Sequence, residues 1–394
     1  MPILGLHRNT IVSQLVPEQW NFNGPVNAIT LERNANGTAT GKIYVGGNYN
    51  RYNGNTANLL IRLNPDGTVD SSFNTGTGFT GEQVRAIVPV SGSTSIYVVG
   101  DFLSYSGSTC HKVIRINSNG TRDLTFNAGT NTSGNIYAIA LASGSDKLYV
   151  GGDFTIYSGS SINRIARVNS NGTLDTSFNV GTGATRTGDG VLPIVYGILP
   201  VTQSDGQIYI VGSFNQYSGS EGNGIARINS NGTLVGTGSF NPGVGNAAGF
   251  EATPYVIKQV PNSSSIYVGG NFTTYSGSNS IRIVRINSNG TRDTSFNTGT
   301  AGFSTNVFSI ADTLDGSGDI YVGGSFTSYS GSTAANRIVR VRSNGTINTS
   351  VSFGAGFNNS VFAIEPTSSA QVYMGGSFTT YKGSTYNYII KLTS

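Results

Sequence analysis

Seven copies of one short motif, Tyr-(Val/Ile/Met)-(Gly/Val)-Gly, recur along the 394 residues and limit the fold more than any other feature. Subtracting neighbouring start positions gives spacings of 52 to 60 residues. The copies begin at Tyr44, Tyr97, Tyr149, Tyr209, Tyr267, Tyr321 and Tyr373. A near-constant period of this length is typical of propellers and other repeat architectures.

Each repeat unit contains the same series of short segments. A segment such as VNAI (from Val26) precedes the YVGG motif, and a tyrosine turn such as YSGSS (from Tyr157) follows it. An alternating segment such as RIVRIN (282–287), an Asn-Gly turn and a segment such as DTSFN (293–297) complete the unit. All are bounded by Gly, Asn or Ser, and no helical period is present. Four short strands per unit predict a propeller blade.

The predicted fold is therefore all-β: a seven-bladed β-propeller of four-stranded blades. The last unit stops after its third strand, and WNFN (20–23) matches the missing fourth strand. An N-terminal strand at about 15–23 is expected to close the ring, which would remove two free sheet edges. We expect an N-terminal arm at 1–19, a propeller at 20–394 and blades at about 24–78, 79–131, 132–184, 185–246, 247–301, 302–357 and 358–394.

The recurring (Val/Ile)-x-Ala-Ile, YVGG-x-Phe, RINSNGT and DTSFN blocks resemble the delta-60 propeller repeat over about residues 20–394. The resemblance implies the propeller fold. It implies no particular activity, because propellers serve many functions.

Most repeated residues are expected to build the scaffold. The glycine pair Gly46-Gly47 and its equivalents predict a close approach of a neighbouring blade to the second strand. An Arg or Lys in each third strand and an Asp in four closing segments favour ion pairs within blades over an anion-binding ring. The turn tyrosines have two interpretations, packing at the blade rim or a sugar-facing surface. The candidates for sugar contact are Tyr157, Tyr217 and Tyr275.

Two long connections between blades break the repeat, at residues 183–193 and 243–254. They are consecutive in the ring and are expected on the same face as the tyrosine turns. Their least repeat-like side chains predict a binding patch made of Arg186, Asp189, Phe250 and Glu251. A weaker interpretation makes Asp189 and Glu251 the paired carboxylates of a glycosidase.

Composition argues against several other functions. Lys plus Arg minus Asp plus Glu is 23 − 19 = +4, without a basic run, so nucleic-acid binding is not expected. One Cys and two His argue against a metal site built on these residues, and no cofactor is expected. No apolar stretch approaches the roughly 18 residues of a membrane span, so membrane insertion is not expected. The first residues also lack the features of a signal peptide.

The opening MPILGL resembles the N-termini of some bacteriophage tail proteins. With a charged fraction of only 11%, it predicts a noncatalytic, tail-associated virion protein with a structural or adhesion role, present in several copies per particle. The arm would dock onto other virion structural proteins, and a propeller face would bind a host surface glycan. The arm residues expected to dock are Ile3, Leu4, Leu6, Ile11 and Val12. The alternative is a bacterial surface or extracellular propeller that binds glycans or proteins.

Overall fold

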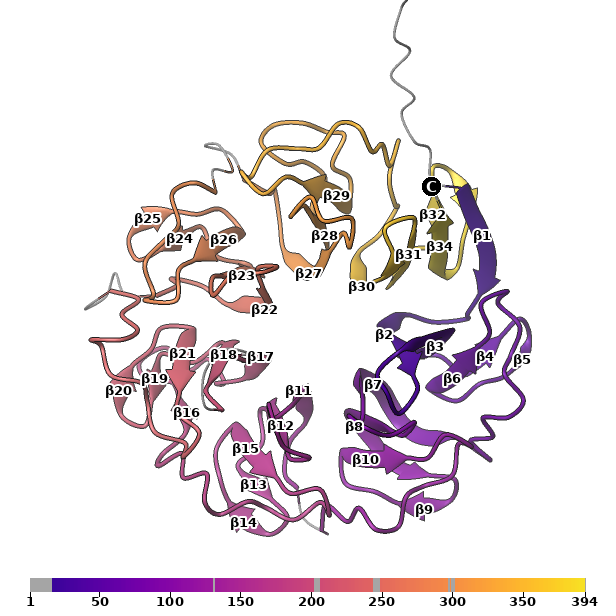
Figure 1. Ribbon diagram of the computed structural model, residues 1–394, viewed down its shortest axis with the longest axis horizontal. Coiled ribbons are helices and arrows are strands. Elements are labelled where there is room, and N and C mark those ends of the chain that lie inside the picture. Colours follow the sequence, from indigo (N-terminus) through magenta and orange to yellow (C-terminus); the bar gives the residue numbers. More distant parts are fainter. Residues whose placement is uncertain are drawn as a thin grey trace, which may run out of the picture.

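The computed structural model describes residues 16–129, 132–201, 206–243, 249–296, 298 and 302–393. Within these residues the regular structure is all β, and seven antiparallel sheets stand side by side around a common centre (Figure 1). We number the sheets one to seven in chain order. Each sheet has three main strands, which we call inner, middle and third in chain order. The inner strand lies nearest the centre and the third strand farther out.

The strand bounds follow the repeat. The inner strands are β2 (Val26–Arg33), β7 (Phe79–Pro89), β11 (Ile136–Leu141), β17 (Val195–Pro200), β22 (Pro254–Gln259), β27 (Val307–Asp312) and β30 (Val361–Ser368). The middle strands, which carry the YVGG motifs, are β3 (Ala39–Gly47), β8 (Ile96–Tyr105), β12 (Leu148–Gly152), β18 (Ile208–Gly212), β23 (Ile266–Gly270), β28 (Ile320–Gly324) and β31 (Gln371–Gly376). The third strands are β6 (Leu60–Leu63), β10 (Val113–Ile116), β15 (Ile165–Val168), β21 (Ile225–Ile228), β26 (Ile283–Ile286), β29 (Ile338–Val341) and β34 (Tyr388–Thr393).

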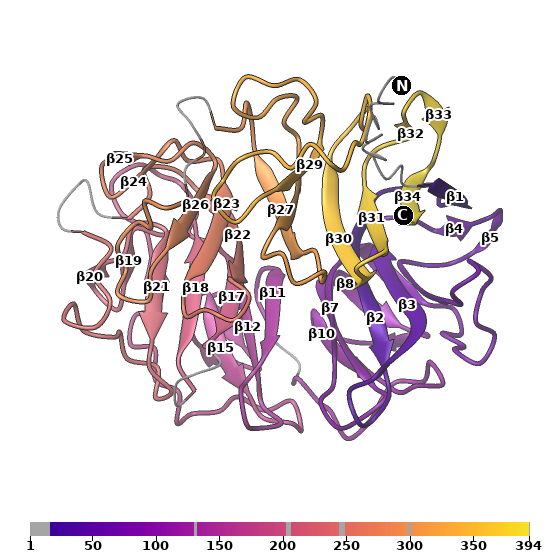
Figure 2. The same cartoon turned by 45° about the horizontal axis from the view of Figure 1, so that its top comes forward.

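The tyrosine turns form small hairpins on one face of the ring. They are β4 (Arg51–Tyr52) with β5 (Asn55–Thr56), the end of β8 with β9 (Ser108–Thr109), β13 (Ile156–Tyr157) with β14 (Ser160–Ser161), β19 (Gln216–Tyr217) with β20 (Ser220–Glu221), β24 (Thr274–Tyr275) with β25 (Ser278–Asn279), and β32 (Thr380–Tyr381) with β33 (Ser384–Thr385). Several lie along the upper rim in Figure 2.

The connections between sheets lie on this same face, as predicted. Phe22 forms an isolated bridge with Tyr52, and Phe250 forms the equivalent bridge with Tyr275. In the fourth sheet, β16 (Ala184–Thr185) pairs with β19. We call this side of the ring the tyrosine face.

The predicted fourth strands are absent from the first six sheets within the described residues. The closing segments make only single bridges to the third strands, such as Leu63 to Val69. In the first sheet, Asp70 Oδ1 accepts a hydrogen bond from the Ser72 amide at 3.0 Å, and this turns the chain two residues after the bridge. Short polar side chains that bond to nearby backbone compete with a strand ladder, so the DTSFN pattern builds a turn here.

The seventh sheet gains its fourth strand from the start of the chain. Strand β1 (Val16–Asn21) pairs antiparallel with β34, and Trp20 lies opposite Ile389. The predicted closing segment, residues 15–23, overlaps β1. The sheet order is β1-β34-β31-β30, so the first and last parts of the chain share one sheet.

Glycines in the middle strands allow neighbouring sheets to approach, as predicted. A Cβ added at Gly46 would lie 2.4 Å from Val84 Cγ1 of the second sheet. A Cβ added at Gly375 of the seventh sheet would lie 2.5 Å from Val26 Cγ1 of the first. Such distances are far below ordinary carbon contacts, so a larger residue would have to displace its neighbour. Gly47 instead makes room for Pro25 of its own sheet.

Candidate functional site

The two long connections meet at one pocket on the tyrosine face, between the fourth and fifth sheets. Its volume is about 390 Å³. The first connection contributes Arg186 and Thr187, and the second contributes Phe250, Glu251 and Ala252. The rest of the lining includes Asn215, Gln216, Glu221 and Asn223 from around the β19–β20 hairpin. We call it the loop pocket. The predicted proximity of the two connections is therefore observed.

Hydrogen bonds to the short segment between β18 and β19 hold the Arg186 segment in place. The Asn215 side-chain amide donates to the Thr187 carbonyl at 2.9 Å and accepts from the Thr187 amide at 3.1 Å. Arg186 Nη1 donates to the Ser213 carbonyl at 3.0 Å. Arg186 Nε also lies 2.9 Å from both carboxylate oxygens of Asp189. Asp189 itself is not part of the pocket lining, so its contact with the pocket is through Arg186.

Glu251 accepts hydrogen bonds from Thr273 and Thr274, at the start of the β24–β25 hairpin. Its Oε2 accepts from the amide and hydroxyl of Thr274, both at 2.8 Å, and its Oε1 accepts from Thr273. Asn23 makes the equivalent contacts in the first sheet, where its Oδ1 accepts from the Asn50 and Arg51 amides. Glu251 is thus a charged version of a repeated structural contact.

Phe250 corrects part of the predicted patch: it borders the loop pocket, but its ring packs in the core. It is 5% exposed, and its ring centroid lies 4.4 Å from that of Phe272 and 4.8 Å from that of Tyr275. Phe22, Phe79 and Phe303 pack in the same way in other sheets. The phenylalanine that lies opposite the turn tyrosine in five of the sheets (Phe22, Phe79, Phe250, Phe303 and Phe357) was therefore a packing signal.

The carboxylates of the patch are unsuited to general acid catalysis. Hydrogen bonds from Arg186 and from the Val191 amide lower the pKa of Asp189 to about 2. Burial raises the pKa of Glu251, but the hydrogen bonds from Thr273 and Thr274 outweigh it and lower the pKa overall. A glycosidase acid needs a raised pKa to carry a proton near neutral pH. The loop pocket therefore offers side-chain amides, a guanidinium and the Glu251 carboxylate, which are groups that can bind hydroxyl groups.

The turn tyrosines do not present their rings to a ligand, which corrects the second interpretation of the sequence. Tyr157, Tyr217 and Tyr275 are completely buried. The Tyr275 hydroxyl donates to the Gly290 carbonyl at 2.6 Å, and Tyr217 makes the same bond to Gly232 at 2.7 Å. The ring and hydroxyl join each hairpin to the Asn-Gly turn that follows the third strand. The function of these residues is structural.

The recurring basic residues make ion pairs within the sheets, as favoured from the sequence. Arg167 Nε lies 2.6 Å from Asp175 Oδ2, and equivalent pairs join Arg62 to Asp70, Arg115 to Asp123 and Arg285 to Asp293. In the fourth sheet Val235 occupies the acid position, and Arg227 Nε is buried without a partner in the described part of the chain. These arginines are committed to the scaffold, so they do not form an open anion-binding ring.

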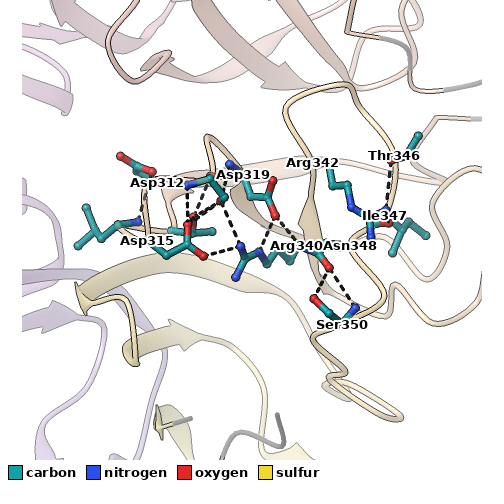
Figure 3. A network of polar contacts seen from close by, with 12 residues as sticks. Asp312, Asp315, Asp319, Arg340, Arg342, Thr346, Ile347, Asn348 and Ser350 are labelled. Carbon is teal, nitrogen blue, oxygen red and sulfur yellow. Dashed lines mark hydrogen bonds and ion pairs between the residues drawn. The ribbon is translucent and has the colours of Figure 1, made fainter. Parts of the chain in front are cut away.

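The sixth sheet contains a compact group of acids around Arg340 (Figure 3). Arg340 Nε lies 2.8 Å from Asp319 Oδ2, and its Nη2 lies 2.5 Å from Asp315 Oδ2. Asn348 donates to the same Asp319 oxygen at 2.6 Å. Both carboxylates therefore pair with the same guanidinium. In the ranges that the structure covers, no group of three or more His, Cys, Asp or Glu is arranged to hold a metal ion.

A second hollow, at the centre of the ring, was missed from the sequence. It has a volume of about 400 Å³ and is lined by Pro25, Asn27, Asn48, Gln83, Arg85, Tyr137, Tyr196 and Phe362. Four of these follow the first residue of an inner strand. That position, the x in (Val/Ile)-x-Ala-Ile, ranges from amide to guanidinium to aromatic between repeats, whereas its neighbours stay small or apolar. This contrast was the signal that could have identified the site.

The predicted docking residues of the arm, Ile3, Leu4, Leu6, Ile11 and Val12, lie outside the described residues, and their role stays a prediction. The part of the chain that is described holds no helix with the length and apolarity needed to cross a bilayer.

A family model with the description "Domain of unknown function (DUF5122) beta-propeller" matches six segments that together make up just over half of the chain. They are residues 38–73, 95–126, 144–178, 203–234, 264–296 and 316–350. The chain belongs to the DUF5122 β-propeller family. The delta-60 subclass stays a prediction, because the matched model identifies the repeat only at the level of the propeller.

Solved structures share the fold of this DUF5122 propeller at low sequence identity. The extracellular domain of the one-component system BT4673 from B. thetaiotaomicron has 16% identity and a TM-score of 0.53, and the match covers 97% of this chain. The chain spans only 40% of that structure. The WD40 β-propeller domain of Doa1 has 10% identity and a TM-score of 0.53, with 97% of this chain and 96% of that one covered. Among the curated proteins, none matches. These likenesses show the fold alone.

Proposed function

We propose that this DUF5122 propeller is a noncatalytic binding module that works outside the cell and recognises a glycan at the loop pocket. The observation that carries the proposal is the meeting of the two connections that break the repeat. Scaffold contacts recur from sheet to sheet, whereas Arg186 and Glu251 line one pocket between two particular sheets. Concave sites with convergent polar groups are the usual form of small-ligand sites.

The working form in this proposal is a seven-bladed ring closed by β1 on β34. The structural similarity to an extracellular domain of B. thetaiotaomicron supports the location. The lowered pKa values of Asp189 and Glu251 support a noncatalytic role. The virion role is not carried further, because it depended on the N-terminal segment, most of which lies outside the described residues, and on composition.

A glycan array probed with the purified chain tests this function. We expect a bound glycan whose affinity falls about tenfold in Arg186→Ala and in Glu221→Ala, since each removes a polar group from the pocket. Lys382→Ala is the control, because Lys382 is exposed on the same face in the seventh sheet. Intact binding in both pocket variants would overturn the assignment of the site. Release of new reducing ends from the bound glycan would overturn the noncatalytic role.

A further inference from the structure

All seven inner strands contain a β-bulge at the same place. In the first sheet Val26 pairs with Gly47 and Ala28 pairs with Gly46, so Asn27 between them has no opposite residue. The other sheets show the same register shift. The bulge residues are Asn27, Arg85, Tyr137, Tyr196, Tyr255, Phe308 and Phe362. Bulges redirect side chains and are frequent beside functional sites.

Five successive bulge residues are aromatic, and they form a continuous arc around the centre of the ring. Ring centroids are 5.3 Å apart from Tyr137 to Tyr196 and 5.4 Å apart from Tyr196 to Tyr255. The arc continues at 5.6 Å to Phe308 and at 5.6 Å to Phe362. All five are half-buried. Tyr137, Tyr196 and Phe362 line the central hollow, and Tyr255 and Phe308 continue the arc between Tyr196 and Phe362. The inner strands that carry them surround the open centre in Figure 1.

The remaining side of the hollow is polar and carries no net charge. Arg85 lies over the Tyr137 ring at 4.0 Å and pairs with the buried carboxylate of Asp101 at 2.6 Å. Gln83 donates to the same carboxylate at 2.9 Å and accepts from the Asn27 amide at 2.9 Å. Because Asp101 neutralises Arg85, a charged ligand gains no unpaired opposite charge there.

The chemistry of the lining selects among ligand classes. A cation would lie close to the Arg85 guanidinium, and an anion would compete with Asp101 for it. A purely apolar ligand would leave amides and phenol hydroxyls without partners, which costs free energy. The Tyr196 and Tyr255 hydroxyls make no hydrogen bond within the described ranges and are free to bind a ligand. Burial raises the pKa of Tyr196 to about 12, so its phenol stays neutral and can donate.

We propose that this hollow, which we call the central mouth, binds a neutral hexopyranose unit. The apolar face of the sugar would pack on the aromatic arc, and its hydroxyls would meet the phenol of Tyr196 and the amides of Asn27 and Asn48. Aromatic surface beside a few fixed polar groups is the combination that holds a sugar ring in orientation. The site is separate from the loop pocket and does not depend on it.

Calorimetric titration with methyl glycosides of glucose, galactose and mannose tests the proposal. We expect at least one of them to bind, with affinity reduced about tenfold in Tyr196→Ala and less in Tyr196→Phe, which keeps the ring. Lys258→Ala is the control: Lys258 lies on the neighbouring inner strand, β22, and is exposed. It is expected to bind as the unchanged protein does. Arg186→Ala separates the sites, because it alters the loop pocket and leaves the central mouth intact.

Three outcomes would overturn the proposal. One is that no neutral glycoside binds to the folded protein. Another is that Tyr255→Ala and Tyr196→Ala bind as tightly as the unchanged chain while their thermal unfolding is also unchanged. The third is that tetramethylammonium or glucuronate binds more tightly than every neutral glycoside, since the class of ligand would then be an ion. If the loop-pocket variants lose binding on the glycan array but still bind the methyl glycosides, the two sites are independent and the central-mouth proposal holds.

Discussion

Lys391 Nζ in the seventh sheet donates a hydrogen bond to the carbonyl oxygen of Pro65 in the first sheet, at 2.9 Å. The same link joins other neighbours: Arg62 donates to Ser118 of the next sheet at 2.8 Å, and Arg115 donates to Ser170 at 2.8 Å. The third strand of the seventh sheet, β34, is therefore bonded to the first sheet in the way that other third strands are bonded to the sheet that follows them. Arg167, Arg227 and Arg285 make the same bond to the sheet that follows theirs, whereas Arg340 of the sixth sheet pairs with Asp315 and Asp319 of its own sheet.

Replacement of Trp20 by Ala is expected to lower the free energy of unfolding by about 3–5 kcal/mol. Trp20 is 3% exposed, packs on Tyr373 at 5.1 Å between ring centroids, and also contacts Gly67 of the first sheet. Its loss opens a cavity where the chain ends meet. Denaturant unfolding measures the change, and Leu124→Ala, at an 82% exposed position, should stay within about 0.5 kcal/mol. Equal effects of the two variants would contradict a structural role for β1.

Two of the turn tyrosines, Tyr275 and Tyr381, allow the contribution of the buried hydroxyl group to be measured, because only the first has a hydrogen-bond acceptor among the described residues. Tyr275→Phe should cost about 1–2 kcal/mol, because the buried Gly290 carbonyl loses its donor at 2.6 Å. Tyr381→Phe should be neutral or stabilising, since the Tyr381 hydroxyl is buried without a partner among the described residues. Thermal unfolding compares the two variants. A larger loss in Tyr381→Phe would disprove this account.

Glu365→Gln is expected to stabilise the protein at pH 7 and not at pH 4. Burial raises the pKa of Glu365, although its Oε1 accepts from the Leu31 amide at 3.2 Å and Lys258 and Arg33 act in the opposite direction. A raised pKa in the folded state means that stability is greatest below the unfolded pKa of about 4.3 and falls as pH rises. Gln has no charge to bury, so the loss of stability at higher pH disappears, and its side-chain carbonyl can still accept the hydrogen bond from the Leu31 amide. The melting temperature should rise by roughly 1–3 °C at pH 7 only. A lower melting temperature at pH 7 would contradict the prediction.

Arg167→Gln should destabilise the protein by about 3 kcal/mol at pH 7, because it leaves the buried Asp175 carboxylate without its Nε contact at 2.6 Å. Arg227→Gln is the control, since Arg227 has Val235 at the acid position, and we expect a smaller loss. Hydrogen bonds from Lys147, Ser177 and Arg167 lower the pKa of Asp175, so its stabilisation is complete above about pH 3.9 and declines below it. Denaturant unfolding between pH 7 and pH 3 should show the two variants converging. A constant gap would exclude Asp175 as the cause.

The repeat made the sheet scaffold predictable because its signals are local. Alternating apolar residues, Asn-Gly turns and the Gly46-Gly47 pair each specify backbone conformation or close approach over a few residues. The closing segments were misread for the same reason. The residues after Asp293 look like a strand, but the Asp293 side chain bonds to the Ser295 amide at 2.9 Å, and that bond turns the chain.

The sequence by itself determined the all-β repeat units, their order and the two connections that break the pattern, since all are set by residues close together in the chain. Only the tertiary structure decided which side chains meet. It buried Tyr275 and Phe250, it placed Arg186 beside Glu251, and it gathered Tyr137, Tyr196 and Tyr255 at the centre. These residues belong to different sheets, and their distances depend on how the sheets pack and where each inner strand bulges. No single repeat contains that information.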